Sequence, residues 1–209
     1  MPNNNFQFKD YARGLKSALD LVDQEQIDNF FDIFDSFIGS DSNIYLLGNG
    51  GSQANAHHIS GDYIKTFSLA GLKLKISCLA DNVCHLTAAS NDLSYDDAYS
   101  MLIDNIISQN DFLIYLSGSG NSLNLVKCAR KAKARKIKQA ALTGFNGGAL
   151  NLLVDYPINI KFDDMEICED IQLSIFHYLK QKLIFKYSSK FENLDLPKYH
   201  KRTLEDLIS

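Results

Sequence analysis

The chain has 209 residues, of which 45% are hydrophobic and 22% are charged, and its formal net charge is −4. These values fit one globular α/β domain with or without helical extensions, and the absence of a basic excess argues against a protein that wraps nucleic acid. The N-terminus is polar, the longest apolar runs are too short to span a bilayer, and the four cysteines form no CxxC pair. From these three observations we expect a cytoplasmic protein with reduced thiols.

Helical and strand patterns alternate along the chain. The apolar periodicity of residues 6–38 predicts two helices that separate near Asp23, and the apolar run Asn43–Leu47 predicts a strand buried on both faces. Further strands are predicted at residues 73–79, 111–116, 138–142 and 156–160, and helices at residues 54–67, 98–108, 122–135 and 168–187. This alternation predicts a doubly wound, parallel, five-stranded α/β sheet with helices on both faces. We divide the chain into N-terminal helices (1–40), the α/β domain (41–187) and a C-terminal tail (188–209).

Three glycine- and serine-rich turns follow predicted strands: Gly48–Ser52, Ser117–Ser122 and Thr143–Gly148. Ligands of open parallel sheets bind at the carboxyl ends of strands, where glycines let backbone N–H groups approach an anion and the next helix N-terminus adds positive charge. The turns match neither the dinucleotide-binding sequence nor the Walker sequence, which favours a compact monophosphate as the ligand. A single such turn would serve equally well as a helix cap, and the third turn is interpreted as structural.

Two predicted helices carry pairs of metal-ligating side chains. His58 and Asp62 share one face of their helix, and Glu169 and His177 share one face of the last helix. If the two faces meet, they offer two imidazoles and two carboxylates, a set suited to Zn²⁺ or to general acid–base catalysis. Either pair alone is more simply a pair of surface residues, and His57 could replace His58 as a ligand.

Other charged residues have simpler interpretations. Lys180 and Lys182 lie near the end of the last helix, where positive charge is favourable, and are interpreted in that way. The basic segment 127–138 is interpreted as a solvated helix face. His85 and His200 have no neighbours in the sequence that suggest chemistry, and are interpreted as structural or solvent-facing.

Taken in order, the motifs resemble those of the phosphoheptose isomerases, a branch of the SIS (sugar isomerase) family. The resemblance rests on Gly48–Ser52 followed by His58 and an acid, on Ser90–Asp92, on the two later turns, and on Glu169–Gln172 followed by His177. It implies a three-layer, flavodoxin-like SIS domain. It also implies a homotetramer with sites at subunit interfaces, and N-terminal helices that help to build that tetramer.

The resemblance further implies a role for each matching residue. The substrate-binding residues would be Asn49, Gly50, Gly51, Ser52, Asn91, Asp92, Ser117, Gly118, Ser119, Ser122 and Glu169. The metal ligands would be His58, Asp62, Glu169 and His177, with Zn²⁺ as the expected ion, and Asp62 and His177 would form the acid–base pair. Asp62, Glu169 and Gly118 stand where Glu, Gln and Thr are usual, and a second-type sub-branch of the family shares these departures.

The expected reaction is isomerisation of D-sedoheptulose 7-phosphate to D-glycero-D-manno-heptose 7-phosphate through an enediol(ate), for lipopolysaccharide or capsule synthesis. Alternatives from other classes are a non-catalytic SIS protein that binds the replication initiator DnaA and a sugar-phosphate-sensing regulator. An isomerase of another sugar phosphate fits the sequence equally well. Asp62 and His177 favour an enzyme, and roughly forty N-terminal residues leave little room for a DNA-binding domain.

Overall fold

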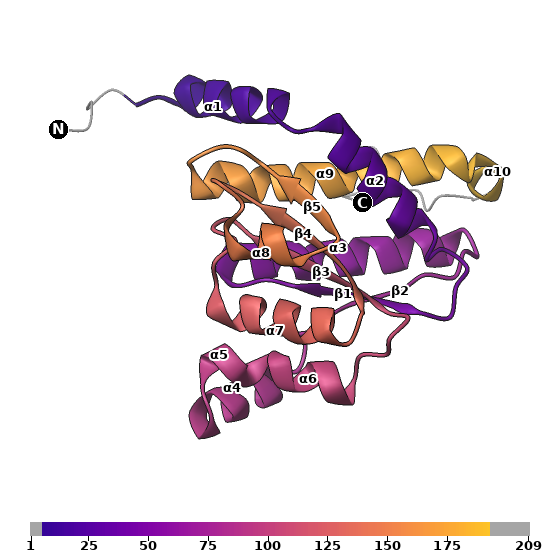
Figure 1. The fold of residues 1–209 in the computed structure, drawn as a ribbon. Coiled ribbons are helices and arrows are strands. Elements are labelled where there is room, and N and C mark those ends of the chain that lie inside the picture. The colour runs from indigo at the N-terminus through magenta and orange to yellow at the C-terminus, as the bar shows by residue number, and fades with distance from the viewer. Residues whose placement is uncertain (1–5, 193–209) are drawn as a thin grey trace, which may run out of the picture.

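The computed structural model describes residues 6–192 and contains one parallel sheet of five strands (Figure 1). The strands run in the order β2-β1-β3-β4-β5, and each neighbouring pair is parallel. Their bounds are β1 Asn43–Leu47, β2 Lys75–Cys78, β3 Phe112–Ser117, β4 Lys138–Thr143 and β5 Tyr156–Asn159. This is the strand order of a flavodoxin-like, doubly wound sheet, so the predicted fold class is confirmed.

Helices cover both faces of the sheet. The longer ones are α1 Phe8–Asp20, α2 Gln24–Asp35, α3 Gly50–Leu69, α4 Val83–Asp92, α7 Leu123–Ala134 and α9 Met165–Lys186. The shorter ones are α5 Tyr95–Ala98, α6 Ser100–Asn105, α8 Gly148–Leu153 and α10 Ser188–Phe191. On one face, α2 and α3 both contact α9, which also carries α1, whereas α7 and α8 cover the other face and α4–α6 lie outside α7 (Figure 1).

Helix α2 belongs to the same hydrophobic core as the sheet. The ring of Phe30 lies 6.4 Å from that of Phe112 on β3 and 5.7 Å from that of Phe176 on α9. The break before α2 arises because the carboxylate of Asp23 accepts hydrogen bonds from the backbone N–H groups of Glu25 and Gln26 and so caps the helix. The division at residues 40 and 187 stays a prediction, and residues 193–209 of the tail lie outside the described part.

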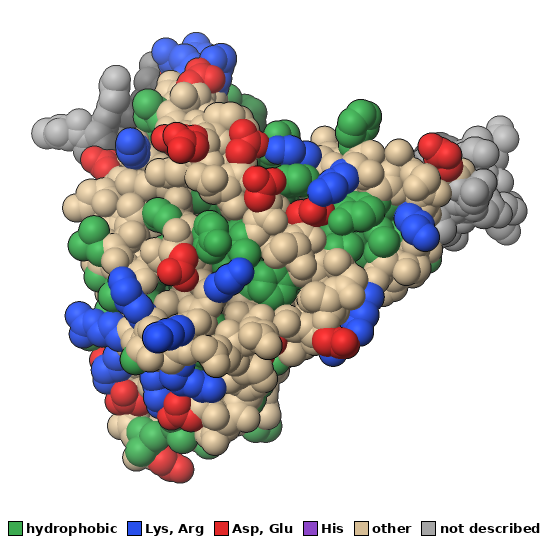
Figure 2. Space-filling view, turned by 45° about the vertical axis from the view of Figure 1, so that its right-hand side comes forward, with side chains coloured by type: hydrophobic (Ala, Val, Ile, Leu, Met, Phe, Trp, Pro, Cys, Tyr) green, Lys and Arg blue, Asp and Glu red, His purple; other side chains and the backbone are tan. Residues whose placement is uncertain are grey.

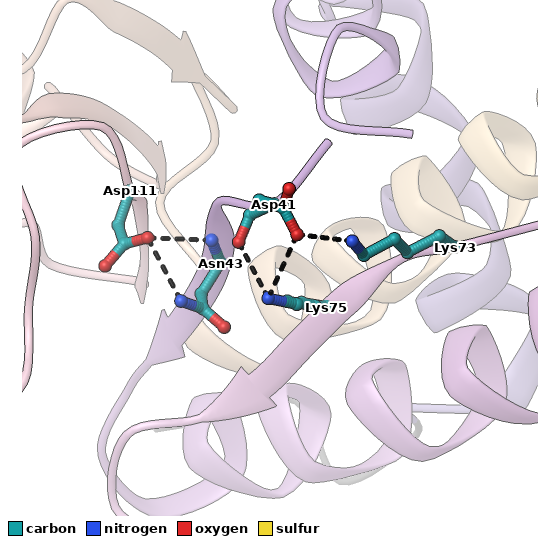
Figure 3. Close-up of polar contacts among 5 residues, drawn as sticks. All are labelled: Asp41, Asn43, Lys73, Lys75 and Asp111. Atoms are coloured by element: carbon teal, nitrogen blue, oxygen red, sulfur yellow. Dashed lines mark hydrogen bonds and ion pairs between the residues drawn. The ribbon is translucent and has the colours of Figure 1, made fainter. Parts of the chain in front are cut away.

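A buried carboxylate ties together the amino-terminal ends of β1 and β3 (Figure 3). Asp111, 2% exposed, accepts hydrogen bonds from the backbone N–H of Asn43 at 2.7 Å, from its side chain at 3.1 Å and from the backbone N–H of Ser108 at 2.8 Å. Beside it, the exposed Asp41 pairs with Lys73 and Lys75. The two carboxylates therefore have different roles. Asp111 accepts hydrogen bonds from buried N–H groups, whereas Asp41 forms its ion pairs in water.

Some helices differ from the prediction. The helices α4, α5, α8 and α10 were not predicted, and the helix predicted at residues 98–108 is the shorter α6, Ser100–Asn105. Helix α4 buries only Ala89, so its sequence lacks the apolar stripe that marks a helix. Helix α8 has six residues and follows Gly147, whose φ is +85°, so a glycine-rich turn conceals its start.

Figure 2 shows Lys and Arg side chains gathered at the lower left of one face, with a few Asp and Glu side chains beside them, while charged and hydrophobic side chains are scattered over the rest of that face. Within residues 6–192, every helix is too short or too polar to cross a membrane.

Candidate functional site

The strand order reverses between β1 and β3, because the chain goes outward from β1 to β2 and then returns to β3 on the other side. In open parallel sheets, ligands bind at the carboxyl ends of the strands at such a switch point. Strand β1 ends at Leu47 and β3 at Ser117, and the register pairs Leu47 with Tyr115. The first two glycine-rich turns therefore lie next to each other at the expected binding edge.

Two helices begin at this edge. Helix α3 starts at Gly50 and α7 at Leu123, and neither Asn49 nor Ser122, the preceding residues, makes a side-chain cap hydrogen bond. The two cap residues thus leave the first backbone N–H groups of both helices without a cap acceptor, although in α7 the N–H of Leu125 donates to Asn124 Oδ1 at 2.9 Å. The helix dipole places partial positive charge at both termini. Adjacent helix N-termini of this kind can bind a phosphate group.

Asn49, in the first turn, is held in place by hydrogen bonds to side chains from α7 and α5. Its Nδ2 donates to Asn124 Oδ1 at 3.0 Å, and Asn124 Nδ2 donates to Asn49 Oδ1 at 2.8 Å. The hydroxyl of Tyr95 donates to the same oxygen of Asn49 at 2.7 Å. Asn124 and Tyr95 were not predicted from the sequence, although a polar residue at a buried position of α7 was a usable signal for Asn124.

The serines of the second turn keep their hydroxyl protons available for a ligand. Ser117 Oγ accepts a hydrogen bond from the backbone N–H of Gly120 at 3.1 Å, and Ser119 Oγ accepts one from the backbone N–H of Asn121 at 3.2 Å. A hydroxyl that accepts a bond in this way can still donate one. The turn can therefore offer hydroxyl donors to an anion.

The third turn and helix α8 donate backbone hydrogen bonds to the second turn. The backbone N–H of Gly144 donates to Gly118 O at 2.7 Å, and that of Leu150 donates to Gly120 O at 3.0 Å. Gly120 has a φ of +65°, and a side chain there would collide with the backbone of Gly147. The interpretation of Thr143–Gly148 as structural agrees with these contacts.

Two glycines of the site lie against side chains of α9. A Cβ at Gly118 would meet the sulfur of Met165, so the Met165 side chain occupies the space that a side chain at position 118 would need. A Cβ at Gly51 would meet the carboxylate of Glu169, which accepts a hydrogen bond from Ser52 Oγ at 3.2 Å. Glu169 therefore lies at the N-terminus of α3.

His58, Asp62 and His177 come together where α3 faces α9. One ligand atom from each lies within 4.8 Å of the other two, and the Nε2 atoms of the two imidazoles are 3.3 Å apart. The predicted meeting of the two helix faces thus occurs within one chain. Glu169 forms no such group with these residues in the described part of the chain, because its carboxylate lies beside Ser52.

The carboxylate of Asp62 has two ammonium partners. It pairs with Lys180 on α9 and, at 3.4 Å, with Lys65 on its own helix. Burial raises the pKa of Asp62, but the hydrogen bond and charge of Lys180, helped by Lys65, outweigh burial and hold the pKa below its usual value of 3.8. The interpretation of Lys180 as a helix-dipole partner was wrong, since its side chain reaches across to α3. Lys182 pairs instead with Asp28 at 2.7 Å.

Not every predicted residue reaches the site. Asn91 and Asp92 are exposed at the end of α4, where Asn91 Nδ2 donates to Asp92 Oδ1 at 2.9 Å. The described residues show no hydrogen bond from either side chain to the two turns. The Nε2 of His85 donates to the carbonyl oxygen of Ala98 at 2.9 Å, as expected of a structural histidine.

Comparisons with known proteins identify the family of this chain. The family model of the SIS domain matches residues 7–144. A protein from Thermoplasma acidophilum named "Probable phosphoheptose isomerase" is 30% identical over 166 residues, which cover 79% of this chain and 91% of that protein. A phosphoheptose isomerase from Helicobacter pylori is 27% identical over 173 residues, covering 83% of this chain and 90% of that protein.

Solved structures show the same fold. A phosphoheptose isomerase from Francisella tularensis superposes with a TM-score of 0.75 at 21% identity and covers 82% of this chain and 91% of its own. The phosphoheptose isomerase from Neisseria gonorrhoeae gives a TM-score of 0.73 at 24% identity, with 82% and 92% covered. By family match, curated relative and fold, the chain belongs to the SIS domain family, in its phosphoheptose isomerase branch.

Proposed function

We propose that the chain is a phosphosugar isomerase that converts D-sedoheptulose 7-phosphate to D-glycero-D-manno-heptose 7-phosphate. The observation that carries the proposal is the arrangement along α3, which has an anion-binding edge at Asn49 and an acid–base cluster at His58 and Asp62. His58 lies six positions after Ser52 on α3, which corresponds to a rise of about 9 Å along the helix. An extended seven-carbon sugar phosphate has a comparable length, so one molecule can reach both places.

In the proposed complex, the phosphate binds where α7 begins. The hydroxyls of Ser117, Ser119 and Ser122 donate to it, and the positive end of the α7 dipole favours its charge. Asn49, held by Asn124 and Tyr95, contacts the sugar beside the phosphate. Binding energy from the phosphate is remote from the reacting carbons and can therefore position them without opposing the reaction.

Asp62 acts as the base in the proposed reaction. It takes a proton from C1 of the open-chain ketose, and the electron pair of that bond forms the enediolate. A proton moves from the C1 hydroxyl oxygen to the C2 oxygen through His177, and Asp62 returns its proton to C2, which leaves the aldehyde at C1. His58 lies 3.3 Å from His177 and can hold it in the required orientation. No atom of the sugar phosphate is gained or lost over these reaction steps.

The chemistry of the donor set supports a zinc ion at this place. Two imidazoles and one carboxylate are a common set for Zn²⁺ with an open position, and His58, Asp62 and His177 provide them. When bound, the ion would supply Lewis-acid polarisation of the sugar carbonyl. Glu169 is proposed either as a further zinc ligand or as a hydrogen-bond acceptor for the sugar hydroxyls. To bind zinc, its carboxylate would have to turn away from Ser52.

We also propose a location, a sub-branch of the family and an oligomeric state for the enzyme. We place the enzyme in the cytoplasm, in a second-type sub-branch that serves lipopolysaccharide or capsule synthesis. A homotetramer is proposed as its working form, with the N-terminal helices in the interface. Support comes from Phe8 on α1 and Phe185 on α9, which are 85% and 84% exposed and would be covered by another subunit.

An isomerase assay across five- to seven-carbon ketose phosphates, with and without a chelator, tests the proposal. We expect conversion of sedoheptulose 7-phosphate to exceed that of the shorter sugars, and activity to fall in the chelator and return with Zn²⁺. Conversion of a different sugar alone would correct the substrate. A failure to convert any member of the panel would overturn the isomerase proposal.

A further inference from the structure

A second group of metal-ligating side chains lies on the other side of α3. His57 on the helix, Cys78 at the end of β2 and Asp81 in the following turn each place one ligand atom within 4.8 Å of the other two. None of the three has a role in the proposed isomerisation. We propose that His57, Cys78 and Asp81 bind one Zn²⁺ ion, which clamps the carboxyl end of β2 to α3.

His57 contacts Asp81 through one ring nitrogen and, through the other, the side-chain amide of Gln53 that also contacts Cys78. His57 Nδ1 lies 3.0 Å from Asp81 Oδ1, and His57 Nε2 lies 2.9 Å from the amide nitrogen of Gln53. The same amide nitrogen of Gln53 donates to the sulfur of Cys78. An imidazole nitrogen and a sulfur therefore converge on one electropositive group, and a cation that displaces the half-buried Gln53 amide would meet both donors.

The donor set selects zinc among the common ions. Thiolate and imidazole bind Zn²⁺ in preference to Mg²⁺ or Ca²⁺, and a carboxylate completes a three-ligand site with water in the fourth position. Bonds of about 2.0–2.3 Å in a tetrahedron require ligand atoms about 3.3–3.8 Å apart. The side chains of His57 and Asp81 are 49% and 55% exposed, so they can rotate to that spacing without disturbing the core.

Cys78 is buried at the end of β2, and burial raises the pKa of its thiol to about 11. The thiolate is the form that binds a metal ion, so a bound cation would have to displace the thiol proton.

The proposed ion is separate from the one near His177. Successive residues of a helix point about 100° apart, so His57 and His58 face different partners. His58 meets His177 on α9, whereas His57 meets Asp81 after β2. The sulfur also distinguishes the sites, because no cysteine belongs to the group of His58, Asp62 and His177.

Absorption spectra of the full chain with Co²⁺ test the proposal, because a cobalt–thiolate bond produces a charge-transfer band in the near ultraviolet. We expect one equivalent of Co²⁺ to produce this band in the His58→Ala/His177→Ala variant, and up to two equivalents to produce it in the wild type, where the other proposed site also takes the ion. The band should disappear in Cys78→Ser and in His57→Gln, the latter at an exposed position that tolerates change. Cys84→Ser, at an exposed cysteine six residues from Cys78, is the matched control and should keep the band.

Thermal unfolding provides a second readout with Zn²⁺ itself. A ligand that binds only the folded state raises the melting temperature, so Zn²⁺ should stabilise the His58→Ala/His177→Ala variant but not its His57→Gln derivative. Lack of the thiolate band in the wild type would overturn the proposal. So would a band that persists in both Cys78→Ser and His57→Gln, or one that disappears in Cys84→Ser.

Discussion

The ammonium group of Lys180 on α9 forms an ion pair with the carboxylate of Asp62 on α3. The side chains are 20% and 14% exposed, so water screens this pair less than a surface pair. The pair links the two helices that carry the acid–base cluster. It also gives Asp62 a resident cation, with which a metal ion would have to compete.

Replacing Lys180 by Met should raise the pKa of Asp62. Burial favours the neutral carboxyl, and the ion pair is what holds the pKa below 3.8. In the wild type this pair contributes stability above pH 3.8 that is lost as the pH falls through the lowered pKa, and in the variant Asp62 should become protonated at a higher pH. Carbon NMR of labelled Asp62 carboxyl measures the shift, and Lys182→Met, which removes the partner of Asp28, should leave it unchanged.

Two glycines of the second turn should differ in their tolerance of a side chain. Gly120 has a φ of +65°, and the Cβ of Gly120→Ala would collide with the backbone of Gly147. We therefore expect this variant to lose about 2–4 kcal/mol of unfolding free energy. In Gly118→Ala the obstacle is the flexible, 40% exposed Met165, and the loss should be below about 1 kcal/mol. Urea unfolding measures both, and equal losses would contradict this description of the turn.

Removal of the Asn124 side chain should reduce activity more than stability. Asn124→Ala removes both hydrogen bonds between Asn124 and Asn49. We expect kcat/KM to fall about 100-fold, as misplaced binding groups can cause, with about 1–2 kcal/mol lost in stability. Asn105→Ala, which removes only a bond from an exposed amide to Met101 O, is the control and should change neither.

The carboxylates at the amino-terminal ends of the strands should contribute unequally to stability. Asp111→Ala leaves the buried N–H groups of Asn43 and Ser108 without an acceptor, which should cost about 2–3 kcal/mol. Asp41→Ala removes only ion pairs with Lys73 and Lys75 that lie in water, and should change the unfolding free energy little. Denaturant melts of the two variants would contradict the account if their order were reversed.

The sequence predicted the features that depend on local pattern. The buried run Asn43–Leu47 and the glycine turns were located because a strand buried on both faces and a tight turn each limit residue choice. Features that depend on packing were missed. Lys180 could not be paired with Asp62, 118 positions away, and Cys78 gave no sign of its approach to His57. Helix α4 was missed because it buries almost none of its side chains.

Conversion of sedoheptulose 7-phosphate in deuterated water, followed by proton NMR, tests the isomerase proposal most directly. The wild type should form the aldoheptose phosphate with deuterium at C2, because a carboxylate base exchanges its proton with solvent before returning it. Asp62→Asn and His177→Ala should each reduce the rate about 100-fold or more. The control is Asp28→Asn, which removes a carboxylate that pairs with Lys182 on α9, and it should not reduce the rate. Turnover undiminished in both Asp62→Asn and His177→Ala would contradict the assigned roles.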